Sequence, residues 1–383
     1  MPVRRESDIK RALISTFIAR TAANAGLRIV YPFLPAISRG LGVTPTAVAS
    51  VIAVRNLGGL ATPLVARAIE RRGRRWMMLV AMLVVTAGVI LTAITGTFLV
   101  AALGIVMVGF AKPAFDIPMQ AWFGDRVPYA ERGRVFGITE LTWSVALIAV
   151  PVSGFLIQLT DWRAPFVLVA VLAVIGTLAI ARMIDRDHPH ERVERKLRFT
   201  PERIRVLVVA FLMCVAAEIP FVVYGQWLED SFGLSVAGIG TFTIAVVIAE
   251  LAGEGLVTVI ADRWGLRRMV MGGLLVSGVA YLALALTGSR LVVGLIVVAL
   301  WIAAFEVTIV AVIPLISEMS IGARERMLSW LAIMISVGRS LGALVAQPIF
   351  TTGGIALSGV VSAACVVVAA LLLLAVSEPD PAG

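Results

Sequence analysis

Twelve long apolar runs, separated by short polar segments, constrain the fold of this chain more than any other feature of its sequence. A helix that crosses a lipid bilayer needs about 20 predominantly apolar residues. With 60% hydrophobic and 15% charged residues among 383, the chain also has more apolar surface than one soluble core could bury. We predict an all-α polytopic membrane protein with twelve transmembrane helices, at residues 11–37, 45–68, 76–95, 97–122, 133–159, 163–182, 204–228, 236–260, 268–287, 290–316, 326–350 and 353–376.

The basic residues are distributed as membrane topology requires, although a net charge of +9 could also suggest nucleic-acid binding. Lys and Arg cluster in the amino-terminal segment and in every second loop after it. The opposite side of the membrane would hold only Arg39, Arg163 and Arg290. Because basic residues are retained on the cytoplasmic side, this imbalance predicts a protein of the plasma (inner) membrane with both termini in the cytoplasm. We expect the lipid bilayer, and not nucleic acid, as its partner.

A short charged loop occurs twice, which indicates an internal repeat. Residues 70–75 read ERRGRR between two apolar runs, and residues 262–268 read DRWGLRR between two others. The acid and the glycine of the second copy each lie 192 positions after those of the first (70 to 262 and 73 to 265), close to half the chain length. We therefore predict two six-helix bundles in the same topology, at 1–183 and 204–383, joined by a cytoplasmic linker at 184–203.

Further motifs complete a combination that is specific to one family. They are Glu70-Arg71-x-Gly73-Arg74-Arg75 with its second copy Asp262-Arg263-x-Gly265, Tyr31-Pro32-x-x-Pro35, Asp125 with Pro128 and Glu131-Arg132-Gly133-Arg134, and Asp161-Trp162-Arg163 with Phe166. In this combination the chain resembles a twelve-helix member of the major facilitator superfamily, and the end of its first span is most similar to the drug-exporter branch. The resemblance implies transport by alternating access, with the first, fourth, seventh and tenth helices lining a cavity.

The resemblance also implies that the charged loop is part of a cytoplasmic gate that favours the outward-open state. Carried over by position, Glu70 would meet the chain near Arg326, and Arg74 would meet Asp125. An alternative is that the basic residues of the loop only set the topology. The implied gate residues are Glu70, Arg71, Gly73, Arg74, Asp125, Asp262, Arg263, Gly265 and Arg326.

Two departures weaken the specific likeness to drug exporters. Ile105 occupies the position of an arginine in that branch, although the following Gly109 is present. In the fifth span, the exporter-type Gly-Pro-x-x-Gly-Gly reads VPVSGF at 150–155, so the proline and one glycine remain. The motifs therefore predict the fold more firmly than the direction of transport.

Ionisable residues inside the spans form a pattern of their own. Each costs a few kcal/mol at mid-membrane, so each needs a partner, water or a neutral state. The third, sixth, ninth and twelfth spans have none in their interiors, which predicts that the other eight surround a polar interior. The candidate substrate and proton pathway of the first half is Arg20, Asn24, Arg28, Arg55, Lys112, Asp116, Gln120 and Glu140.

Several of these residues recur every four positions, so that each set lies on one helical face. At about 1.5 Å rise per residue, Arg20, Asp116 and Glu140 come out at similar depth in three different spans. We expect them to form a charge cluster. It would be either an ion-pair network that holds the bundle together or a part of the substrate and proton pathway.

The interior of the second half has the opposite sign. Glu218, Glu250, Glu254 and Glu306 face one basic residue, Arg339. An alternative is that Glu254, or both Glu254 and Glu250, lie nearer the cytoplasmic end and are only solvated. Because one arginine cannot neutralise four acids, we expect at least one of them to be protonated or to meet a cationic ligand. Burial favours the neutral form of a carboxyl group and a nearby arginine favours the charged form, so relative movement of the two would load or release a proton.

The function that these observations favour is proton-coupled export of a small organic solute by a secondary transporter, expected to act as a monomer. Proton-coupled uptake of a polar metabolite is the alternative, and a non-transporting sensor or scaffold is a minor one. The spans hold no His, and no nucleophile with a base or metal-ligating cluster falls in them, so we expect neither an enzyme nor a metal or cofactor. The sequence has no Walker-type phosphate loop, which disfavours transport driven by ATP.

Overall fold

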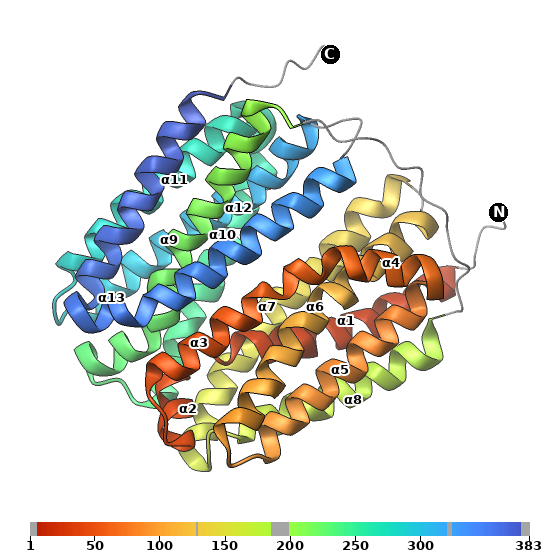
Figure 1. The fold of residues 1–383 in the computed structure, drawn as a ribbon, viewed down its shortest axis with the longest axis horizontal. Helices are drawn as coiled ribbons and strands as arrows, with labels where there is room; N and C mark the ends of the chain where they lie inside the picture. Colours follow the sequence, from red (N-terminus) through yellow and green to blue (C-terminus); the bar gives the residue numbers. More distant parts are fainter. Residues whose placement is uncertain (1–5, 128, 185–198, 320–323, 377–383) are drawn as a thin grey trace. The chain divides into compact units, whose positions relative to one another are not determined.

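The computed structural model describes residues 6–127, 129–184, 199–319 and 324–376, and every regular element in these ranges is a helix. The chain divides into two compact units, Met1–Arg192 and Val193–Gly383. Unit 1 contains α1 (Glu6–Arg28), α2 (Leu34–Leu41), α3 (Pro45–Asn56), the 3-10 turn η1 (Leu57–Ala61), α4 (Thr62–Arg72), α5 (Arg74–Ile94), α6 (Phe98–Arg126), α7 (Tyr129–Leu159) and α8 (Ala164–Met183) (Figure 1).

Unit 2 contains α9 (Pro201–Phe232), α10 (Val236–Trp264), α11 (Leu266–Ala283), the 3-10 turn η2 (Leu284–Leu286), α12 (Leu291–Glu318) and α13 (Arg324–Leu374). Most of the predicted linker at 184–203 lies outside the described residues. The domain boundaries predicted around it stay a prediction.

Ten helices of the described residues are long and apolar enough to cross a membrane. One of them combines α3, η1 and α4, and α13 contains two of the predicted spans. The chain turns within α13 at Gly353 and Gly354, where the backbone is not helical. α1 is not among the ten because it is more highly charged, with Arg11, Arg20 and Arg28 in its last 18 residues. With α1 included and α13 counted twice, the described residues form the twelve predicted spans.

The first predicted span, 11–37, is wrong as one continuous helix. α1 ends at Arg28, and a new short helix, α2, begins at Leu34. Pro32 lacks an N–H that could bond to the Arg28 carbonyl, and it disfavours helical backbone at Tyr31. The first helix of unit 1 is therefore broken, whereas α9, the first helix of unit 2, is continuous.

The internal repeat is present in the detailed backbone of the two units. Gly42 ends α2 with φ 65° and Gly233 ends α9 with φ 64°, a left-handed conformation that glycine adopts without strain. Two residues later, the Thr44 side chain accepts from the backbone N–H of Ala47, and Ser235 caps α10 in the same way. The same device therefore joins the first and second helices of each unit.

The charged loops also correspond. Gly73 has φ 84° and Gly265 has φ 82°, and each lies between two helices. Arg75 donates from Nη2 to the carbonyl of Ala181 at 2.6 Å, near the end of α8. Arg267, 192 positions later, donates to the carbonyl of Leu373 at 3.4 Å, which is likewise 192 positions after Ala181. In both units this arginine binds the carboxyl end of the last helix, where unpaired carbonyls need donors.

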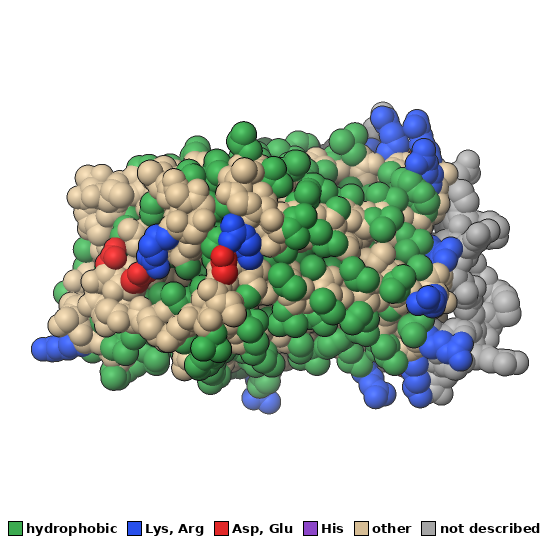
Figure 2. Space-filling view, turned by 90° about the horizontal axis from the view of Figure 1, so that it is seen from below, with side chains coloured by type: hydrophobic (Ala, Val, Ile, Leu, Met, Phe, Trp, Pro, Cys, Tyr) green, Lys and Arg blue, Asp and Glu red, His purple; other side chains and the backbone are tan. Residues whose placement is uncertain are grey.

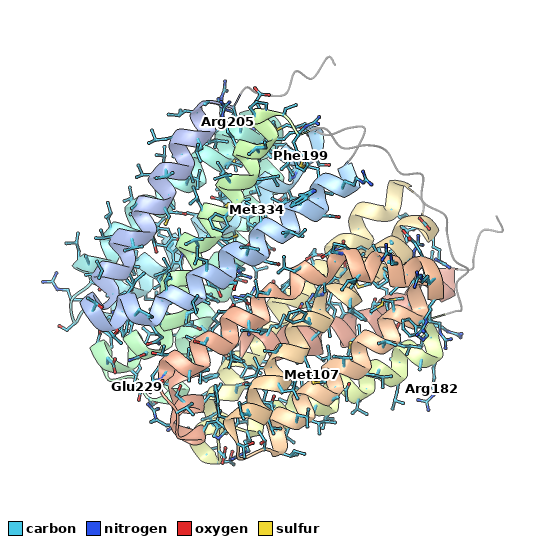
Figure 3. All side chains as sticks on the ribbon, in the orientation of Figure 1. Met107, Arg182, Phe199, Arg205, Glu229 and Met334 are labelled. Atoms are coloured by element: carbon cyan, nitrogen blue, oxygen red, sulfur yellow. The ribbon has the colours of Figure 1, made fainter. Side chains whose placement is uncertain are left out.

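Exposed basic side chains gather near helix ends, beside a largely apolar surface. The face in Figure 2 shows Lys and Arg concentrated at one end, with mostly hydrophobic side chains beside them. Within unit 2, Arg205 and Glu229 lie toward opposite ends of α9 (Figure 3). Leu99, Leu159 and Val259 are among many large hydrophobic side chains that are exposed. Such a surface suits lipid and not water.

Candidate functional site

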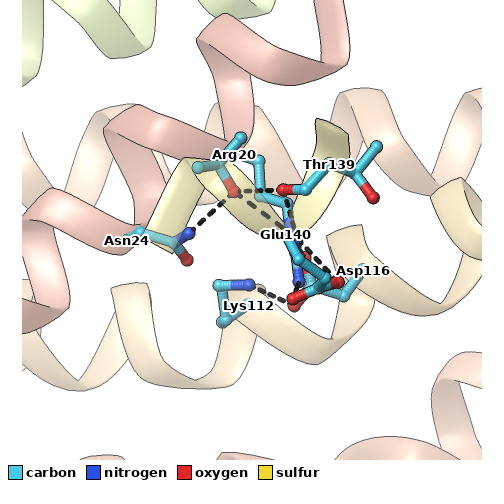
Figure 4. A network of polar contacts seen from close by, with 7 residues as sticks. Arg20, Asn24, Lys112, Asp116, Thr139 and Glu140 are labelled. Atoms are coloured by element: carbon cyan, nitrogen blue, oxygen red, sulfur yellow. Dashed lines mark hydrogen bonds and ion pairs between the residues drawn. The ribbon is translucent and has the colours of Figure 1, made fainter. Parts of the chain in front are cut away.

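Arg20 of α1 lies at the centre of a polar network in unit 1 (Figure 4). Its Nε donates to Oδ1 of Asp116 in α6 at 3.0 Å, and its Nη1 lies 2.9 Å from Oε1 of Glu140 in α7. Nη1 also donates to the backbone carbonyl of Thr139 at 2.6 Å. The side chain of Arg20 is only 3% exposed, so these groups replace water around it. The predicted contact of Arg20, Asp116 and Glu140 is confirmed.

Lys112 lies one turn before Asp116 on α6, and its ammonium group donates to Oδ2, the second oxygen of the Asp116 carboxylate. The Lys112 Nζ is also 4.9 Å from the ring centroid of Trp143 in α7, and the guanidinium carbon of Arg28 is 5.0 Å from it. Both distances fall within the range of a cation–π interaction. The polar residues spaced by four on α1 (Arg20, Asn24 and Arg28) and on α6 (Lys112 and Asp116) therefore meet near α7.

Asn24 is completely buried between Arg20 and Arg28 on α1, and its Nδ2 donates to Oγ1 of Thr142 at 3.1 Å. The Thr142 hydroxyl has one proton, which it donates to the Thr139 carbonyl at 2.7 Å, so it can only accept from Asn24. This assigns the amide orientation and leaves Oδ1 of Asn24 buried with no hydrogen-bond partner in the described residues. In Figure 4 the dashed line from Asn24 starts at the amide nitrogen and not at this oxygen.

The charges of this network balance when all four groups are ionised. Arg20 and Lys112 are positive, and Asp116 and Glu140 are negative. Asp116 contacts two cations and is 19% exposed, whereas the side chain of Glu140 is 48% exposed. Two cations favour the charged form of Asp116. Asp116 is therefore placed to hold α1 and α6 together, and Glu140 is the more exposed acid of this cluster.

Two other residues predicted for this pathway lie elsewhere. Arg55 is 3% exposed at the end of α3, where its Nη1 donates to the Leu27 carbonyl at 2.9 Å and its guanidinium stacks on Tyr31 at 4.7 Å. It contacts the end of α1 and not the Arg20 network. Gln120 is exposed on α6, one turn beyond Asp116.

In unit 2, Glu218 of α9 is completely buried and is paired with Arg339 of α13. The Nε of Arg339 lies 3.1 Å from Oε2 of Glu218, and the Arg339 side chain is 35% exposed. The two helices approach closely because Gly342 has no side chain: a Cβ there would be 2.7 Å from Cβ of Glu218. One partner of this ion pair thus reaches solvent or ligand, and the other does not.

The remaining acids belong to the contact between α10 and α12. Glu250 is 5% exposed on α10, and Glu306 lies on α12, where its Cβ would be 2.8 Å from a Cβ added to Gly253. Glu254, on the turn after Glu250, is half-buried. Of the four predicted acids, Glu218 forms an ion pair with Arg339.

Some polar contacts were not predicted. Gln347 of α13 donates from Nε2 to Oε1 of Gln226 in α9 at 3.1 Å, and Gln347 is 1% exposed. Thr139 enters the Arg20 network through its backbone carbonyl, for which a side-chain pattern carries no signal. Uncharged polar residues in apolar spans, such as Thr142, Gln226 and Gln347, are the signal that a search for ionisable residues passes over.

At the charged loop of unit 1, Nη1 of Arg74 lies 2.5 Å from Oδ2 of Asp125 at the end of α6, which is the expected pairing. Gly73 has φ 84°, a conformation that other residues rarely adopt. Glu70 and Arg71 are exposed. The loop therefore ties the start of α5 to the end of α6.

In the second copy of the loop, Gly265 keeps the positive φ and Arg263 is exposed. The backbone of Asp262 lies in α10, but its side chain is outside the described residues. Arg326 is exposed in the first turn of α13. The contact expected between Glu70 and the chain near Arg326 stays a prediction.

These observations define a class: an integral membrane protein of two repeated six-helix units, with ion pairs buried between spans of each unit. The family model of the Major Facilitator Superfamily matches residues 13–205 and again residues 206–383. The chain therefore belongs to the Major Facilitator Superfamily of transporters.

Named relatives of this chain are transporters of the same superfamily. The uncharacterized MFS-type transporter YwfA of Bacillus subtilis is 23% identical over 92% of this chain and 88% of its own length. The class C tetracycline resistance protein of Escherichia coli is 25% identical over 72% of this chain and 73% of its own. The purine ribonucleoside efflux pump NepI of Escherichia coli is 24% identical over 71% and 72%.

Solved structures show the same fold. A D-xylose-proton symporter matches with a TM-score of 0.79 at 13% identity, over 97% of this chain and 99% of that one. A bacterial homolog of the human lysosomal transporter Spinster, in an inward-facing and occupied conformation, matches with a TM-score of 0.78 at 14% identity, over 98% of both chains. At these identities the likeness concerns the fold alone.

Proposed function

We propose that this protein exports a small organic solute in exchange for protons, by alternating access. Two relatives support export, since one is named a tetracycline resistance protein and another a purine ribonucleoside efflux pump. The first span also ends in Tyr31-Pro32-x-x-Pro35, the feature that most resembles exporters. The buried carboxyl groups within the spans support coupling to protons.

The observation that carries the proposal is the ion pair of Glu218 and Arg339. Glu218 is 0% exposed, and Nε of Arg339 lies 3.1 Å from its Oε2. A carboxyl group without water is charged only while a cation compensates it. A shift of α13 relative to α9 would withdraw that compensation and favour proton uptake, and the return shift would favour release. This is the elementary step that a proton-coupled transporter needs.

The Arg20 network has a different role in this proposal. Asp116 is held by both Arg20 and Lys112, so a single movement does not leave it uncompensated. We assign the network to holding the bundle together and to presenting Arg28, Lys112 and Trp143 to the solute. Glu218 is then the first candidate for the proton carrier, with Glu250 and Glu306 as further candidates.

Purified protein in lipid vesicles with an imposed pH gradient tests the proposal. The solutes are tetracycline, a purine ribonucleoside, benzoate as an organic anion and ethidium as an organic cation. One pH unit is worth about 1.4 kcal/mol per proton, which is enough to concentrate a neutral solute about tenfold in a one-for-one exchange. We expect an antiporter to accumulate at least one of these solutes in vesicles with an acidic interior.

Glu218→Gln should abolish the accumulation that the gradient drives, while passive exchange of labelled solute across the membrane remains. Glu229→Gln is the matched control, because it makes the same change near the far end of the same helix. Accumulation by Glu218→Gln at the wild-type level would refute the role of Glu218. Transport by the wild-type protein that ignores the pH gradient would refute proton coupling altogether.

Uptake with protons remains a second candidate because of the charged interior. Arg20, Lys112 and Asp116 lie within spans and suit a polar solute at least as well as an apolar one, and Ile105 departs from the exporter pattern. A symporter would accumulate solute when the exterior, and not the interior, is acidic. The same vesicles with the reversed gradient distinguish the two directions.

We further propose that the protein acts as a monomer in the plasma (inner) membrane with both termini in the cytoplasm. The distribution of Lys and Arg supports this orientation. In this orientation the pair of Arg74 and Asp125 lies on the cytoplasmic side, where we assign it to the gate.

A further inference from the structure

The break in the first helix of unit 1 is not explained by proline alone. Pro113, Pro118, Pro151, Pro220, Pro314 and Pro348 all lie inside helices that continue past them. Pro220 is informative because it lies in α9, the counterpart of α1 and α2 in the second repeat, which runs unbroken from Pro201 to Phe232. At Pro32, in contrast, residues 29–33 form a non-helical turn between α1 and α2, whereas the second span passes from α3 to α4 through the 3-10 turn η1. Something beyond the proline must stabilise this break.

The backbone at the break leaves one carbonyl to be satisfied from outside the helix. In a continuous helix the N–H of Tyr31 would bond to the Leu27 carbonyl. Here it turns to the Arg28 carbonyl instead, at 3.4 Å. Nη1 of Arg55, from α3, donates to the Leu27 carbonyl at 2.9 Å. Arg55 therefore supplies the donor that the break removes.

Arg55 also contacts the turn that forms the break. Its guanidinium carbon lies 4.7 Å from the ring centroid of Tyr31, and Tyr31 is 4% exposed. Nη2 donates to Oδ1 of Asn56 at 3.1 Å, which fixes the plane of the guanidinium group. One side chain thus binds the residue before the turn through a hydrogen bond and the residue within it through a stacked ring.

The charge of Arg55 fits this position. In the described part of the chain no Asp or Glu forms an ion pair with Arg55, although its side chain is 3% exposed within a span. The carboxyl end of a helix carries partial negative charge on its unpaired carbonyls, and a tyrosine ring presents a negative face. Gly109 of α6 leaves room for the side chain, because a Cβ there would overlap Cγ of Arg55. The site is shaped for an arginine whose partner is the end of α1.

We propose that Arg55 is a positioning residue that holds helix 1 in its broken form and thereby sets the direction of Arg28, the residue after Leu27. Arg28 leaves the last turn of α1 toward Trp143 of α7, so the geometry of the break determines where this cation is presented. The proposal does not depend on the direction of transport or on protons. In this proposal Arg55 stabilises the broken form of helix 1 and has no part in the proton pathway.

Hydrogen–deuterium exchange of the purified protein tests the proposal without a substrate. Without the Arg55 donor the broken form is less stable relative to locally opened states, so we expect Arg55→Met to raise the exchange of the amides of residues 29–31, 33 and 34 by about tenfold. Arg55→Lys should not restore slow exchange, because an ammonium group cannot donate to Leu27 and Asn56 and also stack on the Tyr31 ring as the planar guanidinium group does. Exchange in α9 serves as the internal reference, since its helix needs no such donor.

Three further variants keep the test decisive. Tyr31→Phe retains the ring and should behave as the wild type, whereas Tyr31→Leu should reproduce part of the effect of Arg55→Met. Ser50→Ala, on the same helix but bonded only to the Thr46 carbonyl of its own helix, should leave the break unchanged. Wild-type exchange at 29–34 in Arg55→Met would overturn the proposal. Full restoration by Arg55→Lys would show that positive charge alone is required, and would overturn it as well.

Discussion

Asp116→Asn is expected to be the most destabilising single change in the Arg20 network. Asp116 compensates Lys112 and Arg20, which are 8% and 3% exposed as side chains. Asparagine keeps the shape but removes the negative charge, which leaves Lys112 without its recorded carboxylate partner. Removing one partner of a buried ion pair costs about 3–5 kcal/mol, because an uncompensated charge stays buried.

Two other substitutions in the network, Arg20→Met and Glu140→Gln, should lower the free energy of unfolding by less. Arg20→Met leaves Asp116 paired with Lys112, so we expect a loss nearer to about 1.5–3 kcal/mol, that of a hydrogen bond to a charged group. Glu140→Gln should cost no more than about 1 kcal/mol, because Glu140 is 48% exposed and water can replace its partner. The order of stability is therefore wild type, Glu140→Gln, Arg20→Met and Asp116→Asn.

Thermal unfolding of the purified protein in one detergent, followed by tryptophan fluorescence, measures this order. The double variant Lys112→Met with Asp116→Asn is the decisive control. It removes the buried cation together with its partner, so it should be more stable than Asp116→Asn alone. A melting temperature of Asp116→Asn equal to that of the wild type would show that this carboxyl is neutral in the folded protein, and would refute the argument.

Two predictions concern the repeated loops. Gly42→Val and Gly233→Val should each lower stability by about 1–3 kcal/mol in thermal unfolding, and by similar amounts, because both glycines have nearly the same left-handed backbone, φ 65° and 64°. Unequal losses beyond about 1 kcal/mol would mean that the two loops are under different strain. Glu70→Ala and Gly73→Val should slow transport in vesicles while membrane insertion stays normal, since Gly73, at φ 84°, positions the gate residue Arg74. Loss of insertion would show instead that the loop only sets topology.

Much of the architecture follows from the amino-acid sequence alone, because a bilayer leaves few choices. A span must satisfy its own backbone hydrogen bonds, so a run of about 20 apolar residues becomes a helix wherever it is placed. The repeat at 192 positions likewise corresponds to loops of the same backbone conformation at Gly73 and Gly265. The meeting of Arg20, Asp116 and Glu140 was predictable too, since charges within spans need partners and these three shared a depth.

The break in helix 1 and the role of Arg55 were decided by tertiary structure. Prolines occur in many spans, and we assign the difference between Pro32 and Pro220 to the contact of Arg55 with the Leu27 carbonyl. A hydrogen bond between a side chain and a distant carbonyl leaves no periodic pattern in a sequence. Likewise, the selection of Glu218 as the partner of Arg339 depends on a close approach of α9 and α13 at Gly342. Spacing along one helix predicts which residues share a face, but packing decides which faces meet.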